Sequence, residues 1–223
     1  MNHLLSKIGS YPFEKLNLLH KDIKPSKEVI NLSIGEPKLN ADSKVLDILN
    51  KETNSFSNYP PMNAVPELSE AYRQYLKNHF GIENVAEDEV CLVAGTREGT
   101  FSIIQALFNK ENVKEKPYVV MPNPFYQIYG GATTLAGGEA KFLDCPEEDN
   151  FQPDLDSLKS EDWQKCQILV LCSPNNPTGS VLPLSKLKNI LDLAENYDFY
   201  VVSDECYVDL YTSERSCPSI LQA

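Results

Sequence analysis

The chain has 223 residues, of which 42% are hydrophobic and 23% are charged, a composition typical of a globular protein that can bury a sizeable core. Its formal net charge of -12 argues against binding to a nucleic-acid backbone or an anionic membrane, because both select basic surfaces. No segment is apolar enough to cross a bilayer, the N-terminus lacks the apolar core of a secretory signal, and the six cysteines show no CxxC pairing, so a cytoplasmic protein with reduced thiols is expected.

The N-terminal stretch predicts short elements. Residues 4–8 predict a short amphipathic helix, and residues 11–16 begin another. The segment 30–38 then alternates apolar and polar residues and includes Gly35, where the absence of a side chain lets the backbone turn sharply or approach a ligand.

A longer helix is predicted from Pro66 to Phe80. Its apolar positions recur at helical spacing, Pro66 suits the first turn, and Gly81 suits the C-terminal cap. The stretch 58–61 before it is rich in turn-forming residues, and a loop commonly packs an aromatic such as Tyr59 on the surface.

The apolar run Val90–Val93 predicts a buried strand that leads into Gly95-Thr96-Arg97-Glu98-Gly99 and a helix. A glycine-flanked turn at the start of a helix presents unpaired N–H groups and the positive end of the helix dipole to an anion. The chain contains neither GxxxxGK[ST] nor GxGxxG, so two interpretations of this turn stay open, a phosphate site and a simple helix cap.

Two further strands are predicted, Tyr118–Met121 and Ala140–Leu143. The first ends at Pro122-Asn123-Pro124-Phe125-Tyr126, which leads into another helix, and residues 154–160 predict one more. An aromatic pair at such a position is most often part of the core, so the local pattern alone gives Tyr126 no further role.

The stretch from Gln167 to Tyr211 predicts a β-α-β unit. It consists of a strand, a turn, a helix and a second strand, over residues 168–172, 173–179, 184–194 and 199–202. Because such crossovers are right-handed, Asn176 in the turn and Asp204 after the second strand are expected at the same edge of a parallel sheet. Each has a simpler interpretation, since NNPTG is often only a turn and an acid at a strand end is often a solvated cap.

Five strands alternating with helices predict an α/β fold, a mostly parallel sheet with helices on both faces. Four of the five strands end in loops with chemically specific residues, GTREG, NPFY, SPNNPTG and SDECY. Open parallel sheets bind ligands at the carboxyl edge of their strands, so a site that combines anion-binding, aromatic, amide and carboxylate groups is expected there.

SPNNPTG followed by SDECY resembles the signature of the class I aminotransferases, fold type I enzymes that use pyridoxal 5′-phosphate (PLP). The resemblance implies that Asn176 and Tyr207 hydrogen-bond the phenolic oxygen of the cofactor. It also implies that Asp204 pairs with the pyridinium nitrogen and keeps the ring protonated.

The other two loops resemble positions of the same family. GTREG is similar to its phosphate turn, which implies that the backbone N–H groups of Thr96 and Arg97 bind the cofactor phosphate. PNPFY is similar to the segment that carries the ring-stacking aromatic, which implies that Tyr126 packs on the pyridine ring.

The opening of the chain, SYPFEKLNLL followed by INLSIGEPK, resembles bacterial succinyldiaminopimelate aminotransferases. This resemblance implies a homodimer in which Tyr59 donates its hydroxyl to the PLP phosphate of the neighbouring subunit, and a backbone contact from Gly35 to the substrate carboxylate. The family usually has glycine where Ala64 stands, and a backbone that needs positive φ would strain an alanine by about 1–2 kcal/mol.

The resemblance covers about the first half of a typical family member. The Schiff-base lysine of the family follows the aspartate in an S-x-[ST]-K turn, whereas the last lysine here is Lys188. Residues 1–40 are therefore expected to form an N-terminal arm and the start of a small domain, and residues 41–223 a PLP-binding large domain that is incomplete at its C-terminus.

Together these features predict a PLP-dependent aminotransferase that acts on an amino acid and a 2-oxo acid in lysine biosynthesis, with the 223-residue chain alone inactive. One alternative is a PLP-dependent lyase or decarboxylase of the same fold, and another is a fragment that binds only phosphate or a partner chain. A more distant one is a nucleotide-binding protein with Asp204 and Glu205 as magnesium ligands. No metal, nucleic acid or membrane is expected to bind.

Overall fold

The computed structural model describes residues 2–32, 35, 39–57, 59, 66–111, 116–210 and 217–223. Its contacts divide the chain into two compact units, Gly9–Val65 and a larger unit formed by Met1–Ile8 with Pro66–Ala223. The predicted division at residue 40 stays a prediction. Within the described residues, no helix is both long and apolar enough to cross a membrane.

The smaller unit contains two helices, α1 (Pro12–His20) and α2 (Ser43–Lys51), and a 3₁₀ turn, η2 (Thr53–Ser57). Proline fits the first turn of α1 because its missing N–H would have no partner there. The side chain of Asp42 caps α2 by accepting a hydrogen bond of 2.8 Å from the N–H of Lys44. Ala64, the predicted departure from the family pattern, lies outside the described residues.

A four-stranded parallel sheet in the order β2-β1-β3-β4 forms the centre of the larger unit. Its strands are β1 (Tyr118–Pro122), β2 (Glu139–Leu143), β3 (Cys166–Cys172) and β4 (Tyr200–Asp204). β3 has a neighbour on each side and every one of its residues is buried, as its continuous apolar run predicted. Among the described residues β4 pairs only with β3, and Tyr200 on it is 59% exposed.

Five helices and several 3₁₀ turns complete this unit. The helices are α3 (Pro66–Phe80), α4 (Thr96–Leu107), α5 (Gln127–Ala136), α6 (Ser160–Trp163) and α7 (Leu184–Tyr197). The turns are η1 (His3–Lys7), η3 (Glu87–Glu89), η4 (Glu147–Asp149), η5 (Leu155–Ser157) and η6 (Ile220–Gln222).

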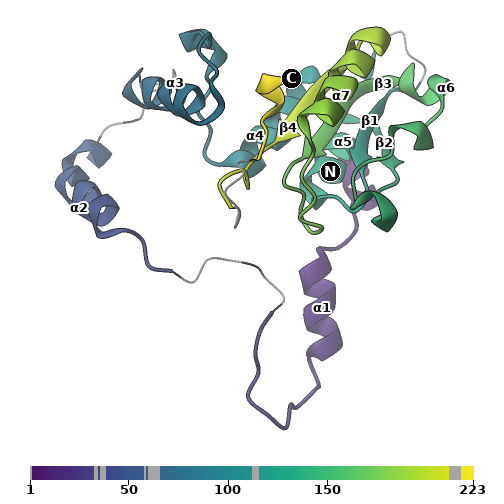
Figure 1. Ribbon diagram of the computed structural model, residues 1–223. Coiled ribbons are helices and arrows are strands. Elements are labelled where there is room, and N and C mark those ends of the chain that lie inside the picture. The colour runs from purple at the N-terminus through teal and green to yellow at the C-terminus, as the bar shows by residue number, and fades with distance from the viewer. Residues whose placement is uncertain are drawn as a thin grey trace. The chain divides into compact units, whose positions relative to one another are not determined.

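Alternate residues of β3 face opposite sides of the sheet. Ile168 and Val170 pack in one core with α4 and α5, whereas Leu169 and Leu171 pack in the other with α7 (Figure 1). Burying an aliphatic side chain contributes about 1.5–3 kcal/mol, so these residues favour a sheet covered on both faces. The predicted α/β fold, a parallel sheet with helices on both faces, is confirmed.

One predicted strand is wrong. Val90–Val93 has no regular secondary structure, and Leu92 and Val93 on it are 37% and 49% exposed. A strand needs a hydrogen-bonded neighbour, and no described residue pairs with this segment, so its apolar run alone was an insufficient signal. The predicted helix over 154–160 is likewise two short pieces, η5 and α6, because Leu158 between them is extended.

Candidate functional site

The carboxyl ends of β3 and β4 lie side by side. The two strands are parallel, and their last residues, Cys172 and Asp204, are paired. The N–H of Ser173 then donates to the carbonyl oxygen of Asp204 at 3.1 Å. The Asn176 turn and the Asp204 carboxylate therefore leave the sheet at one edge, as the β-α-β pattern predicted.

The first of two adjacent asparagines holds the turn after β3. Asn175 is buried, its Nδ2 donates to Oγ1 of Thr178 at 2.9 Å, and its carbonyl oxygen accepts from the N–H of Gly179 at 2.7 Å. Gly179 has φ of +72°, a conformation that favours glycine. Because Asn175 makes the bonds that shape the turn, the side chain of Asn176 is available for contacts outside it.

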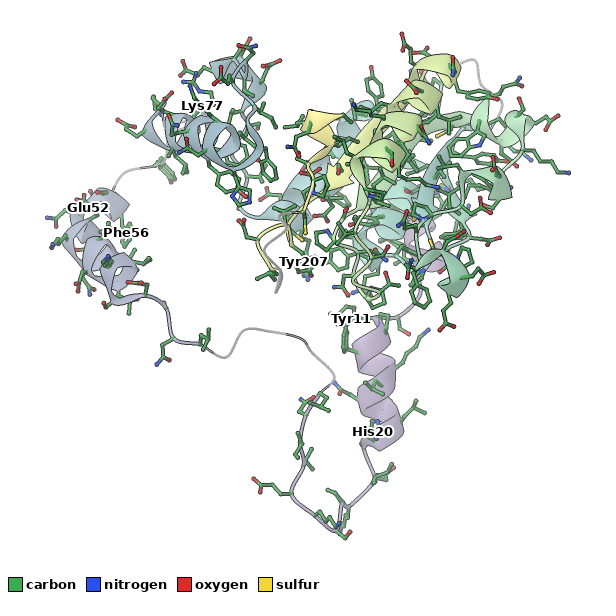
Figure 2. All side chains as sticks on the ribbon, viewed as in Figure 1. Tyr11, His20, Glu52, Phe56, Lys77 and Tyr207 are labelled. Carbon is green, nitrogen blue, oxygen red and sulfur yellow. The ribbon has the colours of Figure 1, made fainter. Side chains whose placement is uncertain are left out.

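Asn176 and Tyr207 meet across two loops. Nδ2 of Asn176 donates to the hydroxyl oxygen of Tyr207 at 3.1 Å, and Tyr207 lies on the loop that follows β4 (Figure 2). This hydrogen bond lowers the pKa of Tyr207, but burial and the nearby Cys206, Cys172 and Asp204 outweigh it, so the net pKa is raised. The phenol therefore stays protonated at neutral pH and can donate to a ligand.

Asp204 is held by a residue that the sequence did not single out. Tyr129, in α5, is completely buried, and its hydroxyl donates to Oδ2 of Asp204 at 2.7 Å. The N–H of Cys206 approaches Oδ1 at the longer distance of 3.3 Å. Burial, followed by Cys172 and Asp204, raises the pKa of Tyr129, so this phenol too stays protonated. Tyr129 follows Tyr126 by three residues, and residues three apart lie on the same face of a helix. This spacing could have indicated Tyr129 as a second site residue.

Tyr126 connects α5 to the start of α4. Its hydroxyl accepts a hydrogen bond of 2.7 Å from Nε of Arg97, and the guanidinium carbon lies 5.8 Å from its ring centroid. The rings of Tyr126 and Tyr129 meet edge to face at 5.8 Å. The sequence had implied only a backbone contribution from Arg97, and its side chain in fact orients the predicted stacking aromatic.

The first turn of α4 begins at Gly95, which has φ of +118° and provides no side-chain cap. The N–H of Ala94 is satisfied by Oε2 of Glu98 at 3.2 Å. The N–H groups of Thr96 and Arg97 in the first turn have no partner inside the helix. They remain as donors at the positive end of the helix dipole, which suits an anion.

These contacts join most of the predicted site into one connected set. Arg97 contacts Tyr126, Tyr126 packs on Tyr129, and Tyr129 bonds Asp204, while Asn176 and Tyr207 are connected through the loop after β4. A cavity of about 770 Å³ along β4 is lined by both Thr96 and Asp204, though not by Tyr126, Asn176 or Tyr207.

Two predicted site residues belong to the smaller unit. Tyr59 is 99% exposed, and a side chain added at Gly35 would meet nothing within 4 Å. Their expected contacts, with a neighbouring subunit and with substrate, stay predictions.

Comparison with known proteins identifies the family. The model for aminotransferase class I and II matches residues 27–222. The LL-diaminopimelate aminotransferase of Aquifex aeolicus is 29% identical over 221 residues, which cover 98% of this chain and 56% of that protein. The aspartate aminotransferase of Pyrococcus horikoshii is 29% identical over 208 residues, which cover 92% and 52%.

Solved structures agree. An aminotransferase from Neisseria meningitidis superposes with a TM-score of 0.91 at 40% identity, covering 100% of this chain and 56% of that one. The aminotransferase AspB from Helicobacter pylori superposes with a TM-score of 0.88 at 35% identity, covering 96% and 55%. The chain thus spans about half the length of the relatives it matches. Enzymes of this family use pyridoxal 5′-phosphate, and the chain belongs to the class I and II aminotransferases.

Proposed function

We propose that this chain carries the cofactor-binding half of an enzyme that transfers an amino group between an amino acid and a 2-oxo acid. The observation that supports it best is a pair of contact groups at the strand ends. One runs from Arg97 through Tyr126 and Tyr129 to Asp204, and the other joins Asn176 to Tyr207. When bound, PLP supplies an electron sink for the reacting carbon of the amino-acid substrate.

The chemistry of the donors fits this cofactor. Asp204 offers a carboxylate oxygen to a protonated ring nitrogen, and its carboxylate has only neutral hydrogen-bond donors around it. Asn176 and Tyr207 offer an amide and a phenol to the phenolic oxygen of the cofactor. The first-turn N–H groups of α4 offer an anion site for its phosphate. The ring nitrogen, the phenolic oxygen and the phosphate of PLP thus each have a complementary partner in the larger unit.

The direct test is binding of pyridoxamine 5′-phosphate to the purified 223-residue chain, measured by isothermal titration calorimetry. We expect saturable binding that Asn176→Ala weakens about tenfold, because a hydrogen bond to a charged oxygen contributes about 1.5–3 kcal/mol. Thr134→Ala is the matched control, since its hydroxyl bonds only the carbonyl oxygen of Gly130 inside α5. Equal affinities of the wild type and Asn176→Ala would remove the support for this site.

The substrate assignment is a finer part of the proposal. The opening stretches of the chain support the succinyldiaminopimelate type, and relatives named LL-diaminopimelate and aspartate aminotransferase support a dicarboxylic amino acid more broadly. A homodimer, with Tyr59 reaching the neighbouring subunit, and a cytoplasmic location belong to the same proposal. The full exposure of Tyr59 and the six free cysteines are compatible with them.

A further inference from the structure

The phenol of Tyr129 is an unusual neighbour for a carboxylate. Its side chain has no exposed surface, and its hydroxyl lies 2.7 Å from Oδ2 of Asp204, the usual distance of a well-formed O–H···O hydrogen bond. Most of the ring is packed in the apolar core formed by α4, α5 and β3. A buried hydroxyl needs a partner, and this one has the Asp204 carboxylate and, beside it, the Cys172 side chain.

The groups that donate hydrogen bonds to the Asp204 carboxylate are neutral, and the cavity that it lines also contains Glu205 and Asp209. The titratable groups that face it are Tyr129 from α5, Cys172 from β3, and Cys206 and Tyr207 from the loop after β4. In the part of the chain that the structure describes, no lysine, arginine or histidine forms an ion pair with this carboxylate. The hydrogen bonds of Tyr129 and Cys206 therefore orient this carboxylate without a cation bound to it.

We infer that Tyr129 is a positioning residue, which fixes Oδ2 of Asp204 so that Oδ1 is presented to the protonated ring nitrogen of the cofactor. This inference rests on the proposed function. A neutral donor suits the purpose, because a cation in the same place would compete with the ring nitrogen for the carboxylate. Since the pKa of Tyr129 is raised, its phenol keeps its proton over the whole working range of pH.

Asp204 stands at the carboxyl end of a strand. It is the last residue of β4, which among the described residues pairs with β3. Tyr129 reaches the carboxylate from a helix packed on the centre of the sheet. The hydrogen bond thus ties the carboxyl end of β4 to the buried core formed with α4 and α5.

The test compares two ligands, pyridoxamine 5′-phosphate and its 1-deaza analogue, in which carbon replaces the ring nitrogen. Tyr129→Phe keeps the buried ring and removes only the hydroxyl. We expect this substitution to raise the Kd of pyridoxamine 5′-phosphate about tenfold and to leave that of the deaza analogue unchanged. In the Asp204→Asn background, the same substitution is expected to have no effect on either ligand.

Tyr197→Phe is the matched control. Tyr197 is a partly buried tyrosine whose hydroxyl lies 3.0 Å from Oγ of Ser160, and both residues precede the amino ends of strands, whereas the site lies at the carboxyl ends. It should change neither Kd. If Tyr129→Phe weakens both ligands equally, or acts equally in the Asp204→Asn background, Tyr129 only supports the fold and the inference is wrong while the proposed function stands.

A measurement on the ligand-free chain distinguishes failure of the positioning role of Tyr129 from failure of the proposed function. Proton NMR of the wild-type chain should show a downfield hydroxyl resonance that is absent from Tyr129→Phe and shifted in Asp204→Asn. Absence of this resonance from the wild type overturns the inference alone. A wild type that shows it but binds no pyridoxamine 5′-phosphate at millimolar concentration overturns the proposed function, and the positioning role with it.

Discussion

Asn175 and Asn176 are adjacent but have opposite surroundings. The buried Asn175 bonds Thr178 within its own turn, whereas Asn176 bonds Tyr207 on another loop. We expect Asn175→Ala to lower the free energy of unfolding by about 1 kcal/mol, and Asn176→Ala to change it by less than about 0.5 kcal/mol. Urea unfolding of both variants checks this, and an equal loss in the two would contradict it.

The thiol of Cys206 is expected to react slowly although the residue is exposed. Desolvation of the thiolate, followed by the Asp204 carboxylate, raises the pKa of Cys206 to about 12. Only the thiolate attacks an alkylating reagent, and at pH 8 a group with that pKa is ionised in about one molecule in ten thousand. We therefore expect iodoacetamide to modify Cys206 far more slowly than Cys91, which is also exposed, with the Cys206 rate rising about tenfold per pH unit up to pH 12.

Asp204→Asn provides the internal check on this prediction. It removes the negative charge that contributes to the raised pKa, so alkylation of Cys206 should become faster while that of Cys91 stays unchanged. Peptide mapping by mass spectrometry measures both rates in one sample. Similar rates for the two cysteines in the wild type at pH 8 would show that Asp204 and burial do not control this thiol.

The lysines of the chain all precede the site carboxylate, since the last of them is Lys188. We expect PLP bound at the site to form no covalent bond with the chain. Sodium borohydride converts an imine between PLP and lysine into a stable amine, so reduction followed by intact-mass measurement should show no stoichiometric adduct. An adduct of one PLP per chain that maps to a single lysine would refute this expectation.

At the scale of elements, Gly95 controls how α4 begins. Its φ of +118° is a conformation that other residues rarely adopt, although a side chain there would meet nothing within 4 Å. Gly95→Ala should therefore lower the free energy of unfolding by about 1–2 kcal/mol through backbone strain alone, and it should weaken pyridoxamine 5′-phosphate binding by displacing the Thr96 and Arg97 N–H groups.

Gly131→Ala is the matched control for this change. Gly131 lies inside α5, its φ is not positive, and the space around it is also open, so alanine should stabilise the helix by about 0.5–1 kcal/mol. Thermal and urea unfolding of the two variants should thus move in opposite directions. If Gly95→Ala unfolds like the wild type, the first turn of α4 does not depend on this backbone conformation.

The sequence predicted those helices and strands whose defining pattern lies within their own residues. β3 is buried along its whole length, and α7 carries its apolar residues at helical spacing, so both were evident from the residues alone. Val90–Val93 has an equally apolar run but lacks a pairing partner among the described residues, and a partner cannot be read from the run itself. Pairing is a property of the assembled sheet.

The candidate site likewise contains residues that motifs predicted and residues that only the fold identifies. Motifs identified Asn176, Asp204 and Tyr207 because these polar residues stand directly after strands, where a parallel sheet collects them. Tyr129 was missed because a tyrosine inside an apolar helix has the pattern of a core residue, and only the fold places its hydroxyl beside Asp204. The side chain of Arg97 was missed for the same reason, since its partner Tyr126 comes from another helix.

At the scale of the whole molecule, the smaller unit carries an apolar face on α2. Its side chains Val45, Leu46, Ile48 and Leu49 are 60%, 46%, 62% and 50% exposed. Contiguous apolar surface of this kind favours association. We expect the chain to form dimers or larger species in analytical ultracentrifugation over a dilution series, and Ile48→Glu to shift it toward monomer, whereas Asp47→Glu on the same helix should not.

A compact, cooperatively folded wild-type monomer that persists at high protein concentration would contradict this expectation. The net charge of -12 makes the comparison depend on ionic strength, because salt screens the repulsion between acidic chains. The dilution series should therefore be run at one fixed salt concentration near 0.15 M.

The outer side of β4 has a thermodynamic consequence. Among the described residues the strand that ends in Asp204 pairs only with β3, and the cavity along it is lined by Asp204 itself. A polypeptide that adds to β4 would therefore contact the strand that holds this carboxylate. The two binding equilibria are then linked. If the polypeptide raises the affinity for the cofactor by some factor, the cofactor raises the affinity for the polypeptide by the same factor.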